Sequence, residues 1–271
     1  MNTCTPLRLL RFLWLPLFLS AVAKADSPPS LRILSYNIHH GAGLDGKIDL
    51  ERIARVIQSA SPDIVSLQEV DRKTKRSGGL DQAARLADLT GMNLVFGSSM
   101  LYQGGQYGNA ILTKLKVVES KTIPLPGEPR SALFATLEEP DQFPRLHFIA
   151  THLDVQGLPR QASLPLIEKM ITTLPPHPAI LAGDLNATPD SPTMTSLFEK
   201  WQNATFGPDF FTSPANQPTS QIDYILIRPA KHWKVVQKKV LPEPLASDHR
   251  PILAVLELPA RRAAEEPEKT R

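Results

Sequence analysis

The chain has 271 residues, and its 30 lysines and arginines exceed its 27 aspartates and glutamates by three. A hydrophobic fraction of 42% supports a globular core, and the length fits one large domain or two small ones. Because Cys4 is the single cysteine, the composition excludes a fold held together by disulfides within the chain.

The first 25 residues are typical of a secretory signal peptide. Arg8 and Arg11 precede an apolar run over 12–23, and Ala23-Lys24-Ala25 offers a small-x-small cleavage site. The run is shorter than the roughly 20 apolar residues of a membrane-spanning helix, although an uncleaved N-terminal anchor is the alternative. We therefore predict export, to a periplasm or to the medium, with no integral membrane span after cleavage.

Removal of this leader changes the charge balance. It takes away three basic residues and no acidic one, which leaves 27 of each sign. Proteins that bind nucleic acid through its phosphates usually present a basic face, so the neutral balance disfavours a nucleic-acid partner without excluding it. We predict a monomer with a signal peptide over 1–25, one folded domain over 26–259 and a disordered charged tail over 260–271.

Apolar periodicity predicts alternating strands and helices in the first third of the chain. The expected order is a strand over 32–37, a helix over 49–58 capped by Asp49, a strand over 64–69 and a helix from Asp81. This order favours an α/β protein. After Gly91 the pattern predicts strands over 93–97, 108–114, 117–123, 131–137, 145–151, 179–184, 222–227, 234–240 and 252–256, and helices over 159–173, interrupted or kinked near Pro165, and over 191–200.

Polar groups follow several of these predicted strands. The strand over 179–184 runs into Gly183-Asp184-Leu185-Asn186, where alternation would place Asp184 and Asn186 on one face. An acid and an amide there suit a cation, a phosphate or an attacking water, although a simple turn is the alternative. Ligand sites of layered α/β folds form where strand ends converge. Other predicted strand ends and loops carry Asn37, Glu69, His152, Asp248 and His249.

Seven short motifs together resemble the endonuclease/exonuclease/phosphatase superfamily, which has a deoxyribonuclease-like fold. They occur in the family's order and are Ser35-Tyr36-Asn37, Gln68-Glu69-Val70, Tyr107 to Leu112, Thr151-His152-Leu153-Asp154, Gly183 to Asn186, Ile222-Asp223-Tyr224 and Ser247-Asp248-His249. The resemblance implies a four-layer α/β sandwich of two packed mixed β-sheets flanked by helices. It also implies divalent-metal-dependent hydrolysis of phosphate esters, with Mg²⁺ as the expected cofactor and Mn²⁺ as an alternative.

The same resemblance implies roles for individual residues. The implied metal ligands are Glu69, Asn37 and Asp248. The implied catalytic residues are His152, Asp184, Asn186, His249, Asp248, Asp223 and Tyr107, and His40, Asn109 and Arg130 are candidate substrate contacts. Either Asp184 or His249 would be the base that activates water, and either Asp223 or Asp248 would orient the His249 ring. The sequence leaves both alternatives open.

Residues outside the motifs have plainer interpretations. We predict that His147, His177 and His232 are surface or loop residues, and that Trp201 and the aromatics of 206–211 pack in the core. Arg160 has two readings, a phosphate contact or a solvated side chain.

The functional prediction is an exported phosphodiesterase or phosphatase whose substrate is a small organic or lipid-headgroup phosphodiester. A secreted nuclease that acts on DNA or RNA is the alternative. An inactive binding module of the same fold is a second alternative, disfavoured because the set of acidic, amide and imidazole residues is intact.

Overall fold

A computed structural model of the chain describes residue 1, residues 29–139 and residues 143–257. The predicted signal peptide, apart from Met1, and the predicted charged tail lie outside these residues, so their boundaries stay predictions. Among the residues that are described, no helix is both long enough and apolar enough to cross a membrane.

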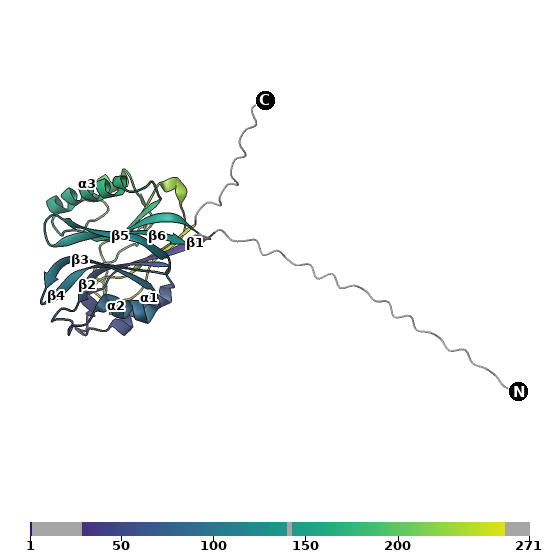
Figure 1. Cartoon of the computed structure of the whole chain (residues 1–271), viewed down its shortest axis with the longest axis horizontal. Helices are drawn as coiled ribbons and strands as arrows, with labels where there is room; N and C mark the ends of the chain where they lie inside the picture. The colour runs from purple at the N-terminus through teal and green to yellow at the C-terminus, as the bar shows by residue number, and fades with distance from the viewer. Residues whose placement is uncertain (2–28, 140–142, 258–271) are drawn as a thin grey trace, which may run out of the picture.

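The described residues form two six-stranded sheets that pack face to face (Figure 1). The first sheet has, in spatial order, β11 (Lys234–Val240), β12 (Ile252–Glu257), β1 (Ser30–Asn37), β2 (Ile64–Arg72), β4 (Gly105–Thr113) and β3 (Asn93–Tyr102). The second has β5 (Lys116–Leu125), β6 (Arg130–Glu139), β7 (Phe143–His152), β8 (Ala179–Asp184), β10 (Asp223–Arg228) and β9 (Gln202–Asn203). Both sheets are mixed, because β1 and β2 are parallel, as are β7 and β8, while the other pairs are antiparallel.

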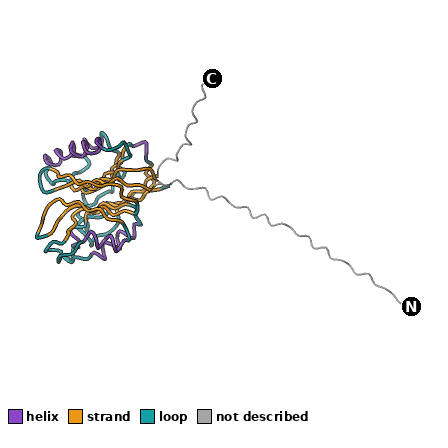
Figure 2. Tube along the Cα trace, viewed as in Figure 1, coloured by secondary structure: helices purple, strands orange, loops and turns teal. Residues whose placement is uncertain are grey.

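Helices cover the outer face of each sheet, so the molecule has four layers (Figure 2). Helices α1 (Leu50–Ala60) and α2 (Gln82–Thr90) pack on the first sheet, and α3 (Gly157–Thr173) and α4 (Pro192–Phe198) pack on the second. Short 3-10 turns, η1 (His39–Gly41) and η2 (Ala230–His232), follow β1 and β10. This is the four-layer α/β sandwich that the resemblance implied.

Side-chain caps begin the first two helices where the sequence predicted them. The Asp49 carboxylate accepts a hydrogen bond from the amide of Arg52 at 2.8 Å, and the Asp81 carboxylate accepts one from Ala84 at 3.1 Å. Each cap gives a partner to a backbone N–H that the first helical turn leaves free. Gly91 ends α2 in the left-handed region, with φ of 68°.

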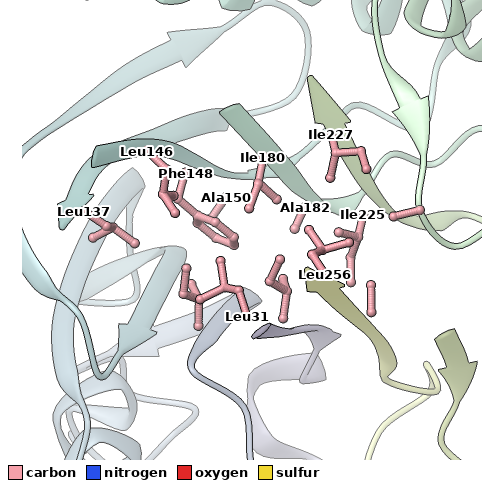
Figure 3. Close-up of a cluster of buried hydrophobic side chains, with 14 of the residues drawn as sticks. Leu31, Leu137, Leu146, Phe148, Ala150, Ile180, Ala182, Ile225, Ile227 and Leu256 are labelled. Carbon is pink, nitrogen blue, oxygen red and sulfur yellow. The ribbon is translucent and has the colours of Figure 1, made fainter. Parts of the chain in front are cut away.

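The main core lies between the two sheets (Figure 3). Side chains alternate along each strand, so Leu31 and Ile33 of β1 point toward Phe148 of β7 and Ile180 of β8. Their neighbours in sequence face the opposite way and pack under the helices, as Leu34 does in the first sheet and Leu181 in the second.

The same alternation places polar side chains at one end of the space between the sheets. Ile180 and Ala182 of β8 face the main core, and Asp184 is the next residue in that row. In β1 the row that starts with Leu31 and Ile33 ends in Asn37. The site is therefore built on the two sheets and not on loops alone.

Several predicted elements differ in extent from the observed ones. Strand β2 continues to Arg72 beyond the predicted end at residue 69, and β3 continues to Tyr102 beyond 97. Both pairings with β4 contain an irregularity that absorbs an extra residue and lets the ladder resume. Helix α3 is one continuous element with Pro165 inside it, so the predicted interruption is wrong.

The predictions for residues outside the motifs hold only in part. His147 is buried in β7, where its ring bonds to Thr136 and to the Pro175 carbonyl, so the surface prediction is wrong. Trp201 and Phe210 are buried as predicted. Phe206 and Phe211 are instead 61% and 40% exposed, so the core prediction is wrong for these two.

Candidate active site

Asp184 lies at the centre of a row of three polar side chains. It is the last residue of β8, and the strand register places it beside His152 of β7 and Asp223 of β10. All three residues are buried. Gly183 allows the strands to come this close, because a Cβ at this position would lie 1.9 Å from the carbonyl oxygen of Thr151.

The Asp184 carboxylate is the most connected group of the site. Its Oδ2 accepts a hydrogen bond from the Asn37 amide at 3.1 Å and lies 3.4 Å from His152 Nε2 and 3.6 Å from His249 Nε2. Its Oδ1 accepts a hydrogen bond from the backbone amide of Asn186 at 2.9 Å. Burial and the neighbouring Asp223 raise the pKa of Asp184 to about 7, although His249 and the two hydrogen bonds oppose this shift.

His249 is paired with Asp223, which settles the alternative that the sequence left open for its orientation. The ring donates from Nδ1 to Asp223 Oδ2 at 2.9 Å, so Nε2 faces Asp184. Burial alone would lower the pKa of His249, but Asp223 and Asp184 outweigh it and raise the pKa to about 10. The ring is therefore a cation at neutral pH. The Ser247 hydroxyl donates to the Asn37 carbonyl at 2.7 Å and ties this loop to the end of β1.

His152 is held as a neutral imidazole by Arg130. The Arg130 guanidinium lies 3.0 Å from His152 Nδ1 and donates to the Tyr107 hydroxyl at 3.2 Å. Arginine has only donors, so His152 Nδ1 accepts from Arg130, and Nε2 faces Asp184 Oδ2 and the Asn186 side chain. Burial, followed by Arg130 and His249, lowers the pKa of His152 well below its usual value.

Asn186 is placed in the site by the loop after β8, and not by the strand alternation that the sequence predicted. Strand β8 ends at Asp184, and Asn186 adopts a left-handed conformation with φ of 48°, so the predicted strand alternation is wrong. Its side-chain amide still lies 3.0 Å from His152 Nε2 and donates to the Leu153 carbonyl. Arg160 holds this loop, because its guanidinium donates to the carbonyls of Asn186, Asp154 and Val155. Neither of the two readings of Arg160 included this role.

A bulge directs Glu69 into the site. In a regular strand Glu69 would share the face of Leu67, which packs under the helices. The pairing of β2 with β4 shifts between Leu67 and Val70, and Glu69 has φ of 60°. Its carboxylate consequently accepts a hydrogen bond from the Asn37 amide at 3.2 Å, beside Asp184. Asn37 thus bridges the two acids.

The remaining predicted residues lie around this centre. Asp248 is partly exposed, and its carboxylate accepts a hydrogen bond from Ser247 at 3.2 Å. The Asn109 amide donates to the Ser131 carbonyl at 2.9 Å and joins the two sheets. His40 belongs to η1, directly after β1. The metal, catalytic and substrate roles implied for these residues stay predictions.

In the part of the chain that the structure describes, two groups of side chains could hold a metal ion. Asp184, Asp223 and His249 have ligand atoms within 4.8 Å of one another, and so do His39, His40 and Glu69. The first group also has an unused acceptor, because Asp223 Oδ1 is buried and has no partner among the described residues. Asp184 and Asp223 lie within 3.6 Å of His249, and Glu69 lies on the other side of the Asn37 amide, so carboxylate oxygens of the kind that divalent cations prefer are gathered here.

A pocket of about 410 Å³ opens beside Glu69 and Tyr107. Arg76 lies in it, bound by two hydrogen bonds to the buried Asp71 at 2.7 and 2.8 Å and placed 4.8 Å from the centre of the Tyr102 ring. Sequence reasoning missed this residue, since an arginine in a stretch rich in basic residues carries no pattern. The lining consists of Glu69, Arg76, Met100, Tyr102, Tyr107, Glu128, Pro129 and Arg130.

Known proteins share both the sequence pattern and the fold. The protein of Escherichia coli K12 named uncharacterized protein YbhP is 25% identical over 246 residues, which cover 84% of this chain and 97% of YbhP. A solved endonuclease/exonuclease/phosphatase from Beutenbergia cavernae is 26% identical with a TM-score of 0.69, over 85% of this chain and 72% of that one.

A mannosyl-6-phosphatase from Bacteroides thetaiotaomicron is similar in fold, with a TM-score of 0.69 at 19% identity, over 83% of this chain and 99% of that one. The model of the Endonuclease/Exonuclease/phosphatase family matches residues 34–249, which include the Asp184, His249 and Glu69 groups described above. The chain therefore belongs to the endonuclease/exonuclease/phosphatase family.

Proposed function

We propose that the protein is an exported, divalent-metal-dependent hydrolase that cleaves a small organic phosphate ester by attack of water. The observation that carries the proposal is the Asp184 carboxylate, which lies within 3.6 Å of nitrogen atoms of Asn37, His152 and His249. A base surrounded by donors and one cation is the arrangement that water attack on a phosphate ester needs.

Asp184 acts as the base in this proposal, and His249 as a cation. A carboxylate with a pKa of about 7 can accept a proton from water near neutral pH, whereas an imidazolium with a pKa of about 10 cannot. The water oxygen bonds to phosphorus and its proton passes to Asp184. The bond from phosphorus to the ester oxygen breaks, the oxygen keeps the electron pair, and it leaves as an alcohol after it takes up a proton from solvent. His249 stabilises the negative charge that develops on the phosphoryl oxygens.

His152 and Asn186 complete the anion-binding side. His152 Nε2, whose ring is oriented by Arg130, and the side-chain amide of Asn186 lie together on the same side of Asp184. Donors held rigidly by protein contacts stabilise developing charge without further rearrangement.

Glu69 and Asn37 would hold the divalent cation, with Mg²⁺ expected and Mn²⁺ as an alternative. Oxygen ligands from a carboxylate and an amide suit a hard cation that keeps several waters. When bound, the ion would supply positive charge at the phosphoryl group. The bulge at Glu69 supports this assignment, since strained backbone of this kind clusters at functional sites.

The pocket beside Tyr107 supports a small substrate. Its two arginines are already paired, Arg76 with Asp71 and Arg130 with Glu128, so it does not present free positive charge to a polyanion. Tyrosine rings and a volume of about 410 Å³ fit an uncharged polar group such as a sugar. The named activity of the Bacteroides thetaiotaomicron neighbour, a mannosyl-6-phosphatase, is of this kind.

Export is part of the proposal and rests on the sequence. The basic residues, the apolar run over 12–23 and the Ala23-Lys24-Ala25 site are its support. Sequencing the N-terminus of protein from a periplasmic extract or the medium tests it, and an intact Met1 there would oppose cleavage.

The activity is tested by hydrolysis with Mg²⁺ and with EDTA. The panel holds sugar phosphates, bis-p-nitrophenyl phosphate, sphingomyelin, phosphoinositides, plasmid DNA and RNA, with Asp184→Ala and His249→Ala as controls. Metal-dependent turnover of a small ester that both variants lose is the expected result. Preference for DNA or RNA would establish the nuclease instead, and absence of both turnover and metal binding would favour the inactive binding module.

A further inference from the structure

Two histidines beside Glu69, His39 and His40, have no part in the reaction proposed above. His39 and His40 follow β1 directly in η1, and with Glu69 they bring three ligand atoms within 4.8 Å of one another. Their ring centres are 4.5 Å apart, and the ring planes are inclined by 68°. All three residues are partly buried.

The backbone of the two histidines is held in a costly conformation. His39 has φ of 45° and His40 has φ of 44°, in a region that non-glycine residues seldom occupy. Buried groups maintain it: the Asn37 side-chain oxygen accepts from the His39 amide at 3.1 Å, and the Gln82 amide donates to the His40 carbonyl at 2.6 Å. Packing could be achieved by residues in an unstrained backbone conformation, so it does not explain two successive histidines with positive φ.

The ring nitrogens are arranged as metal ligands usually are. His39 Nδ1 donates to the Ala42 carbonyl at 3.3 Å, which leaves the Nε2 lone pair free. A metal-binding histidine typically donates its second nitrogen to a carbonyl or carboxylate in this way. His40 Nδ1 is buried, and within the described part of the chain it has no hydrogen-bond partner. A buried nitrogen without a hydrogen bond destabilises the folded protein. A bound metal ion or a proton donor would remove that cost.

We propose that His39, His40 and Glu69 form a metal site that prefers a transition-metal ion, such as Mn²⁺ or Zn²⁺, to Mg²⁺. Imidazole ligands suit these ions, whereas Mg²⁺ takes oxygen ligands almost exclusively. Metal–ligand bonds of about 2.1 Å would place ligand atoms roughly 3–3.4 Å apart. The three atoms, which lie within 4.8 Å of one another, would therefore have to move closer on binding the ion. This metal site shares Glu69 with the proposed reaction centre. A role for it in catalysis therefore rests on the proposed hydrolase function.

Substitution to asparagine gives a sharp test. Asparagine tolerates the left-handed conformation better than most residues, so His39→Asn and His40→Asn keep the turn while they remove the imidazoles. The matched control is His177→Asn, which removes a partly buried histidine in the loop before β8. The thermal midpoint of each EDTA-treated protein reports whether the fold is kept.

Metal binding, not turnover, is the readout. Titration calorimetry of the purified EDTA-treated protein with Mn²⁺, Zn²⁺ and Mg²⁺ gives the affinities, and electron spin echo of the Mn²⁺-loaded protein reports nitrogen ligands directly. We expect the double variant to lose at least about tenfold in Mn²⁺ and Zn²⁺ affinity, to change little in Mg²⁺ affinity and to lose the nitrogen signal, while His177→Asn matches wild type.

The opposite results overturn the proposal. Unchanged Mn²⁺ and Zn²⁺ affinity in the double variant, or a wild-type Mn²⁺ signal without nitrogen coupling, excludes imidazole ligands from these histidines. The two proposals also fail separately. Nitrogen-ligated Mn²⁺ without hydrolysis of any ester would reject the function alone, and Mg²⁺-dependent hydrolysis with no imidazole ligand would reject the metal site alone.

Discussion

The space between the two sheets has an apolar part and a polar end, and both are built from the same rows of inward-facing side chains. On β8 the row passes from Ile180 through Ala182 to Asp184, and on β10 it passes from Ile227 through Ile225 to Asp223. Burial of the apolar part stabilises the fold, whereas the polar end holds charged groups whose burial costs free energy. Residues that stabilise the fold and residues that carry out the reaction therefore lie in different stretches of the same strands. Substitutions in one stretch should change stability, and substitutions in the other should change activity.

Asp184→Asn tests the polar end with the largest expected effect. The amide keeps the shape of the side chain but cannot take a proton from water, so kcat should fall by about 10²- to 10⁴-fold. The thermal midpoint in EDTA should not fall, because a buried carboxylate next to Asp223 is removed. Asp190→Asn, at an exposed aspartate, is the control. Activity within a few-fold of wild type would reject Asp184 as the base.

Phe148→Ala tests the apolar part. Phe148 is fully buried between the sheets, and its truncation should lower the free energy of unfolding by about 3–5 kcal/mol in urea titrations. The activity per folded molecule, measured well below the thermal midpoint, should stay near wild type. Leu158→Ala, at a side chain that is 82% exposed, should change stability by less than about 0.5 kcal/mol. A loss of turnover as large as that of Asp184→Asn would contradict the separation.

The pH dependence of stability sharpens the comparison at His249. Its pKa is raised from 6.5 to about 10, so the ring contributes stability that is fully present below pH 6.5 and is lost as pH rises through 10. In EDTA, wild type should lose more unfolding free energy between pH 7 and 10 than His249→Gln does. With His249 present, Asp184 has a pKa of about 7 and titrates mostly below this window. Parallel curves for the two proteins would refute the pairing of His249 with Asp223.

Arg76→Lys has the smallest expected effect and tests the pocket beside the polar end. Lysine keeps a charge for Asp71 but cannot form the two parallel hydrogen bonds, so the pocket wall should loosen. We expect KM for the preferred small ester to rise about tenfold, with kcat on bis-p-nitrophenyl phosphate nearly unchanged, a loss of about 1.4 kcal/mol. Arg145→Lys, at a half-exposed arginine that is paired with Glu138 far from the pocket lining, is the control. An equal change in the kinetic constants for both substrates would show that Arg76 does not contribute to substrate selectivity.

The sequence predicts the architecture well because its signals are local. Alternation and capping residues such as Asp49 identify nearly every element, and the motif order leads to Asp184, His152 and His249 before any contact is seen. Periodicity also limits what can be predicted. It assumes unbroken strands, and both Glu69 and Asn186 enter the site through left-handed backbone that breaks the alternation.

Other features depend on contacts between distant parts of the chain. His147 is buried by the loop before β8, and Arg160 binds carbonyls of two segments, so no local pattern indicates either role. Arg76 is held in the pocket by its hydrogen bonds to Asp71 and by its contact with the ring of Tyr102 in β3. Pairings of this kind are set by tertiary packing, which a pattern of single residues does not contain.

The row formed by His152, Asp184 and Asp223 also matters for protein engineering. Because strand register sets these three positions, loops beyond the strands other than those that carry Asn186 and His249 can be exchanged or lengthened without moving this row. A deletion of one residue within β8 would instead turn Asp184 toward the helices. New substrate specificities should therefore be sought by loop libraries grafted onto unaltered β7, β8 and β10.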